Sequence, residues 1–531
     1  RLHEVASAEV TVIRVGRRLV RFAVVSSRRP SALAGVEEGD DFSTPSGMPA
    51  VPEAAPRGRI VAVVLNPFLN DTRVLKQARS LRAAGHEVHV VAVWKPGLAV
   101  EDEVDGLPVH RVRLSSAAVL GMPRVLLAGR SRRLRRLLEA RSSAWRDATP
   151  PATADASGEA PSTSSRNDLG RRRIRGLWLA RRAVGVIVST LRRTARRLLS
   201  PKALYPARQI GMSLDLAGRI LELEPDVVHC HDLNTVVAGH LVRRVLDCPV
   251  VYDSHELWLE RNLAGRSRFW DRLQWGFVER RLIGRCAAVS TVAEGIAHHL
   301  ESQYGLAKVE LIRNVQPFTP PASKSHLLAD ELGIEHDRRI ALYAGGILRH
   351  RGIEQLIRAS KLASDRIAWI VMGYATQPAY LEELRAFAER EGVLGTRLYF
   401  RDAVPPDAVN EYAASSDIAV VPTEAICLSY EFEASNKIFH SVMARVPVAM
   451  SDHIEKRLIN ERHGIGVLFD ETDPADIART VETFLDDRVR YDAAVEACGR
   501  AADILNWEHE ERTLLAMFER VTRERGTAAA R

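Results

Sequence analysis

The feature that most constrains the fold is a strand–helix–strand pattern near residue 60. Residues 60–65 (IVAVVL) form an apolar run of strand length. Residues 72–84 carry apolar side chains at helical spacing and are followed by Gly85, a typical helix terminator. Residues 88–93 (VHVVAV) form the next apolar run. Because parallel strands need a crossover that is usually a helix, this pattern predicts a parallel sheet covered by helices.

The same alternation recurs along two stretches of the chain. Further strands are expected in the first stretch at 226–229, 249–252, 287–290 and 309–312, and in the second at 340–344, 369–372, 397–400, 418–421, 447–450 and 466–469. With 531 residues, the chain is long enough for two cores. We therefore predict an α/β fold with two doubly wound, Rossmann-like domains that face a central cleft. Ligands of such sheets bind at the carboxyl ends of the strands.

Breaks in the alternation set the expected domain boundaries. Residues 1–57 are expected to be poorly ordered, because their second half is rich in Gly, Pro, Ser and acids without periodicity. A first domain is expected at 58–317, interrupted at about 115–213 by a basic, partly disordered insertion. A second domain is expected at 318–505, and a C-terminal helix and tail at 506–531.

The insertion carries the excess positive charge of the chain. Residues 122–214 hold 21 Lys and Arg against 5 Asp and Glu, whereas the whole chain holds 75 and 67. Residues 170–208 contain no acid and alternate arginines with Leu, Val and Trp. Basic amphipathic segments favour anionic membranes, so we expect residues 124–208 to contact such a surface. A solvated arginine-rich insertion is the alternative. The chain lacks an RNA-binding module, so no nucleic acid partner is expected.

The cysteines and the hydropathy pattern indicate a compartment. The five cysteines include no C-x-x-C pair, which argues against a disulfide framework or structural zinc and predicts reduced thiols. No apolar run reaches the roughly 18 residues of a membrane-spanning helix. The first residues lack the uninterrupted apolar stretch of a signal peptide. We expect a cytoplasmic protein, peripheral on the cytoplasmic face of the membrane.

A loop rich in glycine and arginine follows the first strand of the second domain. Residues 345–352 read GGILRHRG. Gly345 and Gly346 allow the backbone to approach a phosphate, and the next helix offers its positive N-terminal end. Arg349 and Arg351 add charge and bidentate geometry. The loop therefore predicts a phosphate-binding site, with an ordinary turn carrying solvated arginines as the alternative.

A second basic feature opens a later helix of the second domain. Ser435 or Asn436 is placed to cap this helix, and Lys437 lies in its first turn. A cation is unfavourable at that end of a helix unless an anion binds there, so Lys437 also indicates a phosphate site. The preceding loop is acidic, and its carboxylates can accept hydrogen bonds from sugar hydroxyls or be simply solvated. The acidic residues are Glu424, Glu431 and Glu433.

Three polar loops follow strands of the first domain. All three are expected to converge on one crevice, which predicts a binding site. The spacing of the histidines matches no helical zinc motif, and the chain has no D-x-D pair, so no metal is expected. The loops are 66–71 (NPFLND), 229–232 (HCHD) and 253–256 (DSHE).

Together these segments resemble the family-4 glycosyltransferases, which have the GT-B fold. The resemblance spans residues 59–519 apart from the insertion. It rests on NDTRV at 70–74 with GHEV at 85–88, DVVHCHD at 226–232, YDSHE at 252–256, the loop at 345–352, NKIF at 436–439 and PV at 447–448. The loop at 345–352 is similar to the diphosphate loop of the family, and the segment at 436–439 to its donor-site helix.

The resemblance implies a retaining, hexosyltransferase-type reaction on a nucleotide-sugar donor, with no cofactor required. Arg351 stands where the family has a diphosphate-binding lysine, Lys437 at a basic donor-site position, and His231 in the acceptor-side loop, so these three are the implied catalytic residues. The implied donor-binding residues are Gly345, Gly346, Arg349, Arg351, Glu431, Glu433, Asn436, Lys437 and His440. The implied acceptor-side residues are Asn70, Asp71, Asp232, His255 and Glu256.

The implied partners are a nucleotide sugar and an acceptor glycan or lipid-linked glycan, as in the synthesis of a surface polysaccharide or glycolipid. The sequence departs from the family at its E-x7-E pair, which aligns with Phe432 and His440. Glu431 or Glu433 is then a candidate for the first contact, and His440 for a ribose contact. Two alternatives stay open: a nucleotide-sugar epimerase or hydrolase of the same fold, and a catalytically silent binding or scaffold protein.

Overall fold

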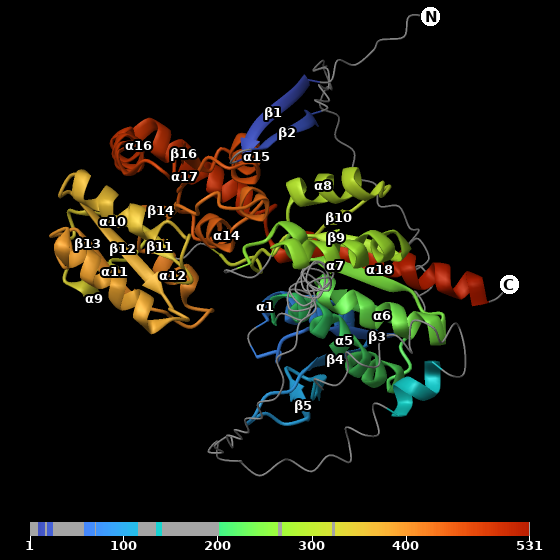
Figure 1. The fold of residues 1–531 in the computed structure, drawn as a ribbon. Coiled ribbons are helices and arrows are strands. Elements are labelled where there is room, and N and C mark those ends of the chain that lie inside the picture. The colour runs from blue at the N-terminus through green and yellow to red at the C-terminus, as the bar shows by residue number, and fades with distance from the viewer. Residues whose placement is uncertain are drawn as a thin grey trace, which may run out of the picture.

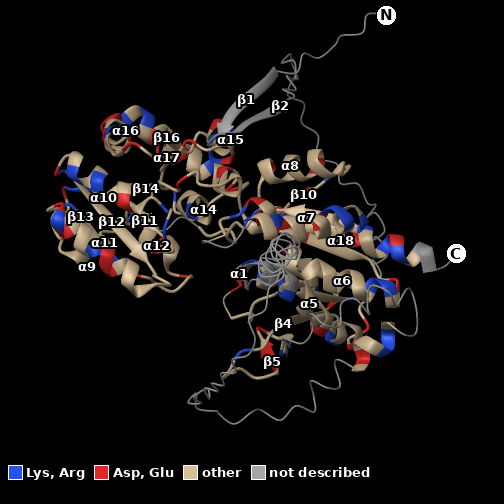
Figure 2. Cartoon of the chain, viewed as in Figure 1, with Lys and Arg blue, Asp and Glu red and all other residues tan. Residues whose placement is uncertain are grey.

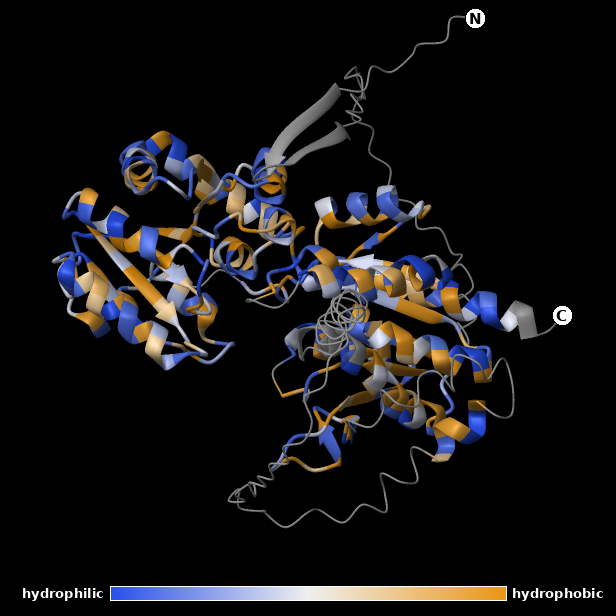
Figure 3. Ribbon diagram, viewed as in Figure 1, coloured by the Kyte–Doolittle hydropathy of each residue, from blue (hydrophilic) through white to orange (hydrophobic). Residues whose placement is uncertain are grey.

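Two parallel sheets, each flanked by helices, form the body of the protein (Figure 1). The computed structural model describes residues 58–69, 71–114, 134–140, 208–263, 268–320 and 324–526, together with the backbone of 9–15, 18–24, 201–207 and 527–529. The strands of both sheets are mainly hydrophobic, and the helices carry hydrophilic residues on their outer faces (Figure 3). The α/β fold with two Rossmann-like domains, predicted from the alternation, is confirmed.

The first sheet begins as the sequence predicts, with β3 (Arg59–Val63), α1 (Thr72–Ala83) and β4 (Glu87–Val93). Its strand order is β10-β9-β8-β7-β3-β4-β6-β5. The neighbours in this described sheet pair in parallel, apart from the antiparallel pair β5–β6, which the sequence analysis did not predict. The other strands are β5 (Glu101–Val104), β6 (Leu107–Val112), β7 (Val227–His231), β8 (Val250–Ser254), β9 (Ala288–Thr291) and β10 (Glu310–Leu311).

Helices cover this sheet, and part of the expected insertion belongs to them. Residues 134–140 are helical, and Leu134 and Leu138 are buried in the core of the first domain. The helix α5 begins at Pro201, earlier than the expected end of the insertion near 213. The helices are α5 (Pro201–Glu222), α6 (Leu233–Leu246), η1 (Trp258–Glu260), α7 (Arg268–Leu282), η2 (Ile283–Arg285) and α8 (Glu294–Tyr304).

The second sheet has the order β13-β12-β11-β14-β15-β16 and is parallel throughout its described pairs. Its strands are β11 (Arg339–Ala344), β12 (Ile367–Gly373), β13 (Leu398–Asp402), β14 (Ile418–Val421), β15 (Val448–Ser451) and β16 (Gly466–Phe469). Its helices are α9 (Leu327–Leu332), α10 (Ile353–Leu362), α11 (Pro378–Arg390), α12 (Val409–Ala414), α13 (Leu428–Glu431), α14 (Asn436–Met443), α15 (Ile454–His463), α16 (Pro474–Asp486) and α17 (Arg488–Ala502).

The last helix, α18 (Trp507–Ala529), leaves the second domain and packs on the first (Figure 1). Its buried residues Leu514, Met517 and Phe518 share a hydrophobic cluster with strand residues of the first sheet. Trp507 is buried in the same cluster, and its indole Nε1 donates to Ser80 Oγ at 3.0 Å. The sequence predicted this helix but not its position, and the chain therefore crosses twice between the domains.

The N-terminal region contains a hairpin that the sequence analysis did not predict. β1 (Glu9–Val15) pairs antiparallel with β2 (Arg18–Val24). The rest of 1–57, and residues 115–133 and 141–200 of the expected insertion, lie outside the described residues. Within the described part of the chain, no helix is both long and apolar enough to cross a membrane.

Candidate functional site

The strand order reverses once in each sheet, and the predicted site loops lie at these two reversals. In the second sheet the reversal falls between β11 and β14, and in the first between β3 and β7. Loops that leave neighbouring strands in opposite directions at this point open a crevice at the carboxyl ends. Both crevices therefore combine the polar loops that the sequence singles out.

The glycines of the 345–352 loop permit close contacts that a side chain would block. A Cβ at Gly345 would lie 2.6 Å from Cε of Lys437. A Cβ at Gly352, whose φ is +74°, would lie 1.8 Å from the carbonyl oxygen of Pro422. The peptide carbonyl of Gly346 accepts a hydrogen bond from the Tyr343 hydroxyl at 2.7 Å. The loop is thereby held against the segment that follows β14.

Arg351 makes the central ion pair of this crevice with Glu433. Its Nη1 lies 2.7 and 2.9 Å from the two carboxylate oxygens, and the guanidinium lies 5.0 Å from the ring centre of Tyr430. Burial favours the neutral form of Glu433, but the nearby cations, Arg351 first, outweigh burial and lower its pKa. Glu433 is thus ionised and fixes the side chain of Arg351.

Lys437 lies beside this pair without a carboxylate partner of its own. Its Nζ lies 5.0 Å from the centre of the Tyr343 ring, and no hydrogen bond or ion pair is found for it among the described residues. Burial, helped by the charge of Arg351, lowers the pKa of Lys437 to about 8. A half-buried cation without a partner is costly, and a bound anion would relieve that cost.

Lys456 is a third cation in this crevice, and the sequence analysis missed it. It lies on α15, is fully buried, and Nζ lies 3.0 Å from His453 Nδ1 and 3.4 Å from Ser451 Oγ. Burial lowers its pKa to about 8, and its charge contributes to the lowered pKa of Glu433. A single lysine in an amphipathic helix has no sequence signature, so only the fold reveals it.

Other predicted donor-site residues have different surroundings. Arg349 turns to the exposed surface, where it pairs with Glu383 at 2.5 Å and lies 4.5 Å from the ring centre of Tyr380. Asn436 is exposed at the start of α14, and Glu431 is half-buried at the end of α13. The charge of Glu431 acts on Lys456. Glu424, from the same acidic loop, lies 2.9 Å from His350 Nδ1.

His440 has protein partners on both ring nitrogens. Nδ1 lies 2.9 Å from Asn410 Oδ1, and Nε2 lies 3.0 Å from Gln316 Nε2. Burial lowers its pKa to about 4, with Lys76 contributing, so the ring is neutral at pH 7. A contact from His440 to a ribose therefore requires the exchange of one of these hydrogen bonds.

Phe432, at the first E-x7-E position, joins the two domains. Its ring is 2 % exposed and belongs to the hydrophobic cluster of the first domain. A Cβ at Gly295 would lie 2.3 Å from this ring. Beside it, the carboxylate of Glu455 accepts from the backbone N–H groups of Glu294 and Gly295 at 3.0 and 2.8 Å. The start of α8 is therefore bound by the second domain through both a ring and a carboxylate.

In the first domain, Asp253 is the centre of a buried hydrogen-bond network. Arg73 donates to its two oxygens at 2.7 and 2.8 Å, and to the carbonyl of Ile312 at 2.7 Å. Gln77 and Ser290 also donate to Asp253, at 3.0 and 2.8 Å. Burial would raise the pKa of Asp253, but Arg73 and its other donors hold it well below the usual range.

This network positions His231 and His255. Nδ1 of His231 lies 3.3 Å from Asp253 and 3.2 Å from His255 Nε2. Burial lowers the pKa of His231. Burial also opposes protonation of His255, but the negative charges of Asp232 and Asp253 outweigh it and raise the pKa of His255 to about 9. The site thus pairs one charged and one neutral imidazole.

The remaining acceptor-side predictions fall around this network. Asp71 caps α1 by accepting from Val74 N at 3.2 Å and also accepts from Asn66 Nδ2 at 2.8 Å. Asp232 adopts a strained backbone with φ of +64° and accepts from His255 N at 3.2 Å. Glu256 is half-buried and lies 3.9 Å from Arg261. The prediction for Asn70 lies outside the described residues.

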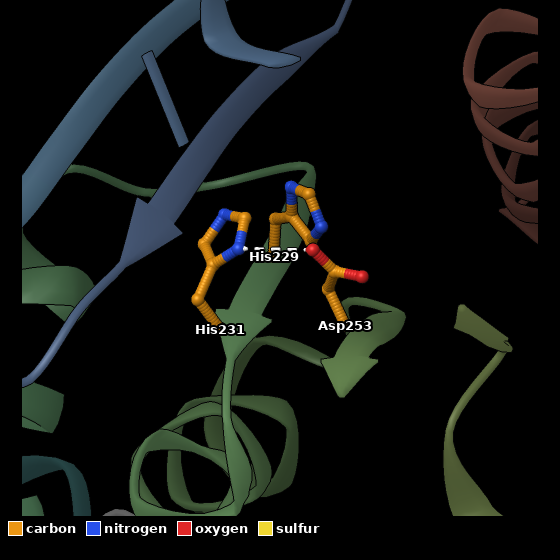
Figure 4. Close-up of side chains that lie close together, drawn as sticks. All are labelled: His229, His231 and Asp253. Carbon is orange, nitrogen blue, oxygen red and sulfur yellow. Dashed lines mark ion pairs between the residues drawn. The ribbon is translucent and has the colours of Figure 1, made fainter. Parts of the chain in front are cut away.

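His229, His231 and Asp253 could together offer three ligand atoms to a metal (Figure 4). These atoms lie within 4.8 Å of one another. The Nε2 atoms of both histidines are buried without a hydrogen-bond partner in the described part of the chain. However, the guanidinium of Arg73 donates to both oxygens of Asp253, and its charge opposes a cation there. The residues therefore do not fit a metal centre.

Comparison with known protein families shows which family this chain belongs to. Residues 167–315 match the family described as Glycosyltransferase Family 4, and residues 338–487 match Glycosyl transferases group 1. The chain belongs to the family-4 glycosyltransferases. The first match begins at residue 167, inside the expected insertion at 115–213, and does not include residues 59–166, where part of the resemblance lies.

Characterised relatives of this glycosyltransferase are distant. The alpha-maltose-1-phosphate synthase of Mycolicibacterium smegmatis is 24% identical over 320 residues, which cover 56% of this chain and 79% of the relative. The D-inositol 3-phosphate glycosyltransferase of Xylanimonas cellulosilytica is also 24% identical over 320 residues, covering 56% and 73%. Relatives with different products share this level of identity, so the comparison supports the enzyme class and not a particular substrate.

Solved structures confirm the GT-B fold of this glycosyltransferase. The sucrose-phosphate synthase of Thermosynechococcus elongatus superposes with a TM-score of 0.61 at 13% identity, covering 88% of this chain and 99% of that one. The Anabaena protein HepE, solved in complex with UDP and glucose, superposes with a TM-score of 0.57 at 12% identity, covering 87% and 99%. At such identity the likeness establishes the fold alone.

Proposed function

We propose that this glycosyltransferase moves a hexose from a nucleoside diphosphate sugar to an acceptor glycan or lipid-linked glycan, with retention of anomeric configuration. The domain at 318–505 binds the donor, and the domain at 58–317 binds the acceptor. The product would be a surface polysaccharide or glycolipid. The observation that carries the donor assignment is the cluster of three cations, Arg351, Lys437 and Lys456, around Glu433 in the second crevice.

The charges of this crevice suit a diphosphate. Arg351, Lys437 and Lys456 all act on Glu433, and Lys437 has no carboxylate partner of its own among the described residues, whereas Lys456 is also influenced by Glu471 and Glu431. The diphosphate of a nucleotide sugar carries the complementary charge. As the glycosidic bond breaks, negative charge grows on the leaving diphosphate, and fixed cations stabilise it. The side chains thus supply the charge that a metal supplies in other transferases, and we propose that no metal or cofactor is required.

The first crevice provides a neutral hydrogen-bonding group, whereas the second crevice provides cations. His231 is neutral and held by Asp253, and its Nε2 is buried without a partner among the described residues. Such a nitrogen suits a sugar hydroxyl. We propose that His231 orients the sugar against the acceptor.

The proposed partners include an anionic membrane surface on the cytoplasmic side. This proposal rests on the acid-free, arginine-rich sequence within residues 124–208. Much of that segment lies outside the described residues.

Release of nucleoside diphosphate tests the proposal. Purified protein is incubated with a panel of nucleotide sugars, with and without membrane lipid extract. We expect release from one donor, rising with lipid, and a product whose anomeric configuration by NMR matches that of the donor. Release that needs no acceptor would instead indicate a hydrolase or epimerase, and binding without release from any pair would indicate a silent binding protein.

A further inference from the structure

Helix α7 of the first domain exposes an apolar stripe. Phe269, Leu273 and Phe277 are 66%, 55% and 67% exposed. They are spaced four residues apart, so they lie on one face of the helix. Isolated exposed apolar residues are common, but three in register on one helix form a patch that calls for a partner. The hydrophobic turns of α7 are visible in Figure 3.

The exposed face of α7 carries basic residues and no acid. Arg268, Arg280 and Arg281 are exposed along the same helix, and Figure 2 shows these basic turns. The two acids of α7, Asp271 and Glu279, are buried on the opposite face. Asp271 pairs with Arg261, and Glu279 accepts from the Tyr304 hydroxyl at 2.7 Å. The stripe is therefore apolar at its centre and positive at its ends.

A basic recess lies at the C-terminal end of α7. It is lined by His240, Arg243, Arg244, Leu282 and Arg285. None of these residues is acidic, and burial lowers the pKa of His240 to about 4, so that ring is neutral. Arginines gathered in this way repel one another, and an anionic group in the recess would relieve the repulsion.

The apolar stripe and the surrounding arginines fit an anionic lipid bilayer better than a protein partner. A protein partner needs acidic groups at fixed positions, and a second copy of this chain would place arginine against arginine. The segment of residues 170–208 is itself basic and would be repelled in the same way. An anionic bilayer offers an apolar interior for the stripe and negative headgroups for the arginines around it.

We propose that the exposed face of α7 docks the protein on an anionic lipid bilayer. The phenylalanines and Leu273 enter the boundary between headgroups and acyl chains, and the arginines bind lipid phosphates. This deepens the membrane partner proposed above, but it assigns it to a described surface outside residues 124–208.

Co-sedimentation with vesicles tests the surface in the full chain. The vesicles contain phosphatidylcholine and phosphatidylglycerol in equal parts, without donor or acceptor. We expect the combined variant Phe269→Ser, Leu273→Ser and Phe277→Ser to bind these vesicles about tenfold or more weakly, because buried apolar area drives interfacial binding. The control replaces three exposed apolar residues of the second domain, Leu362, Val489 and Ile504, by serine and should bind as the unaltered chain does.

A charge variant separates the electrostatic contribution. Arg280→Gln with Arg281→Gln should weaken binding to the anionic vesicles and leave the weak binding to pure phosphatidylcholine unchanged. Unaltered binding by both the serine and the glutamine variants would overturn the proposal and leave the membrane contact to residues 124–208. Because no donor is present, either result is independent of the nucleotide-release assay that tests the proposed transferase.

Discussion

Arg351, Lys437 and Lys456 gather around Glu433, and this cluster of cations is the basis of the donor assignment. Arg351 is fixed by the ion pair, whereas Lys437 lies over Tyr343 and Lys456 beside His453. The glycine at 345 is what allows Lys437 to approach the loop. At the scale of single residues, we propose that these cations bind the diphosphate of the donor.

Replacement of Lys437 should therefore affect catalysis more than stability. We expect Lys437→Ala to lower the turnover of the donor about 100-fold, because one charged contact to the leaving group is lost. The melting temperature should change little, since burying this cation is unfavourable without a ligand. Lys361→Ala, an exposed lysine paired with Glu391 in the same domain, is the matched control. Equal turnover by both variants would remove Lys437 from the site.

Donor affinity should fall as the pH rises through about 8. Lys437 and Lys456 have pKa values lowered to about 8, chiefly by burial, so both are charged below that pH and neutral above it. The neutral forms no longer attract a diphosphate. Titration calorimetry of a nucleoside diphosphate from pH 7 to pH 9 should show progressively weaker binding. Constant affinity across that range would contradict the role of these lysines.

The sequence located some residues of this site and missed others for physical reasons. The glycine loop and the lysine at the start of α14 carry recognisable spacing, so Arg351 and Lys437 could be predicted. The direction of a side chain in a loop depends on its neighbours, so the pairing of Arg349 with Glu383 could not. Lys456 escaped, since a buried charge gives no periodic signal, and Asp253 was placed in a polar loop but not at the centre of a buried network.

At the scale of elements, α8 and α15 connect the domains. Glu455 of α15 caps the N-terminus of α8, and Phe432 packs on the same turn. A helix start needs acceptors for its free N–H groups, and here another domain supplies them. The apolar alternation predicted the other strands of both sheets but missed β5 (EDEV), because an exposed edge strand needs no apolar residues, and also β6 beside it.

Removal of this cap should loosen the domain interface. Glu455→Ala leaves two backbone N–H groups without their acceptor, and we expect a loss of about 1–3 kcal/mol in the free energy of unfolding. Chemical denaturation followed by tryptophan fluorescence measures it. Glu461→Ala, an exposed acid on the same helix, should have no such effect. Equal stability of the two variants would show that the cap contributes nothing.

At the scale of the whole molecule, α18 makes the two domains depend on each other. The chain enters the second domain, completes it, and returns to close the core of the first. The sequence could not predict this return, because a terminal amphipathic helix fits several apolar surfaces equally well.

Replacement of Trp507 tests whether the stability of the first domain depends on α18. Trp507 is buried where the chain re-enters the first domain, and we expect Trp507→Ala to cost about 3–5 kcal/mol, as other large-to-small core substitutions do. Scanning calorimetry should show a lower unfolding temperature than in the control Arg512→Ala, an exposed position of the same helix. Coincident unfolding curves would mean that α18 is dispensable for the first domain.

The central claim is that the positive crevice of the second domain binds the diphosphate of a nucleotide sugar. Titration calorimetry of a panel of nucleoside diphosphates against the unaltered chain and Lys437→Ala tests it most directly. The account predicts that at least one of them binds the unaltered chain and that its affinity falls at least about tenfold in the variant. Undiminished binding by the variant, or no binding of any of them to the folded chain, would contradict it.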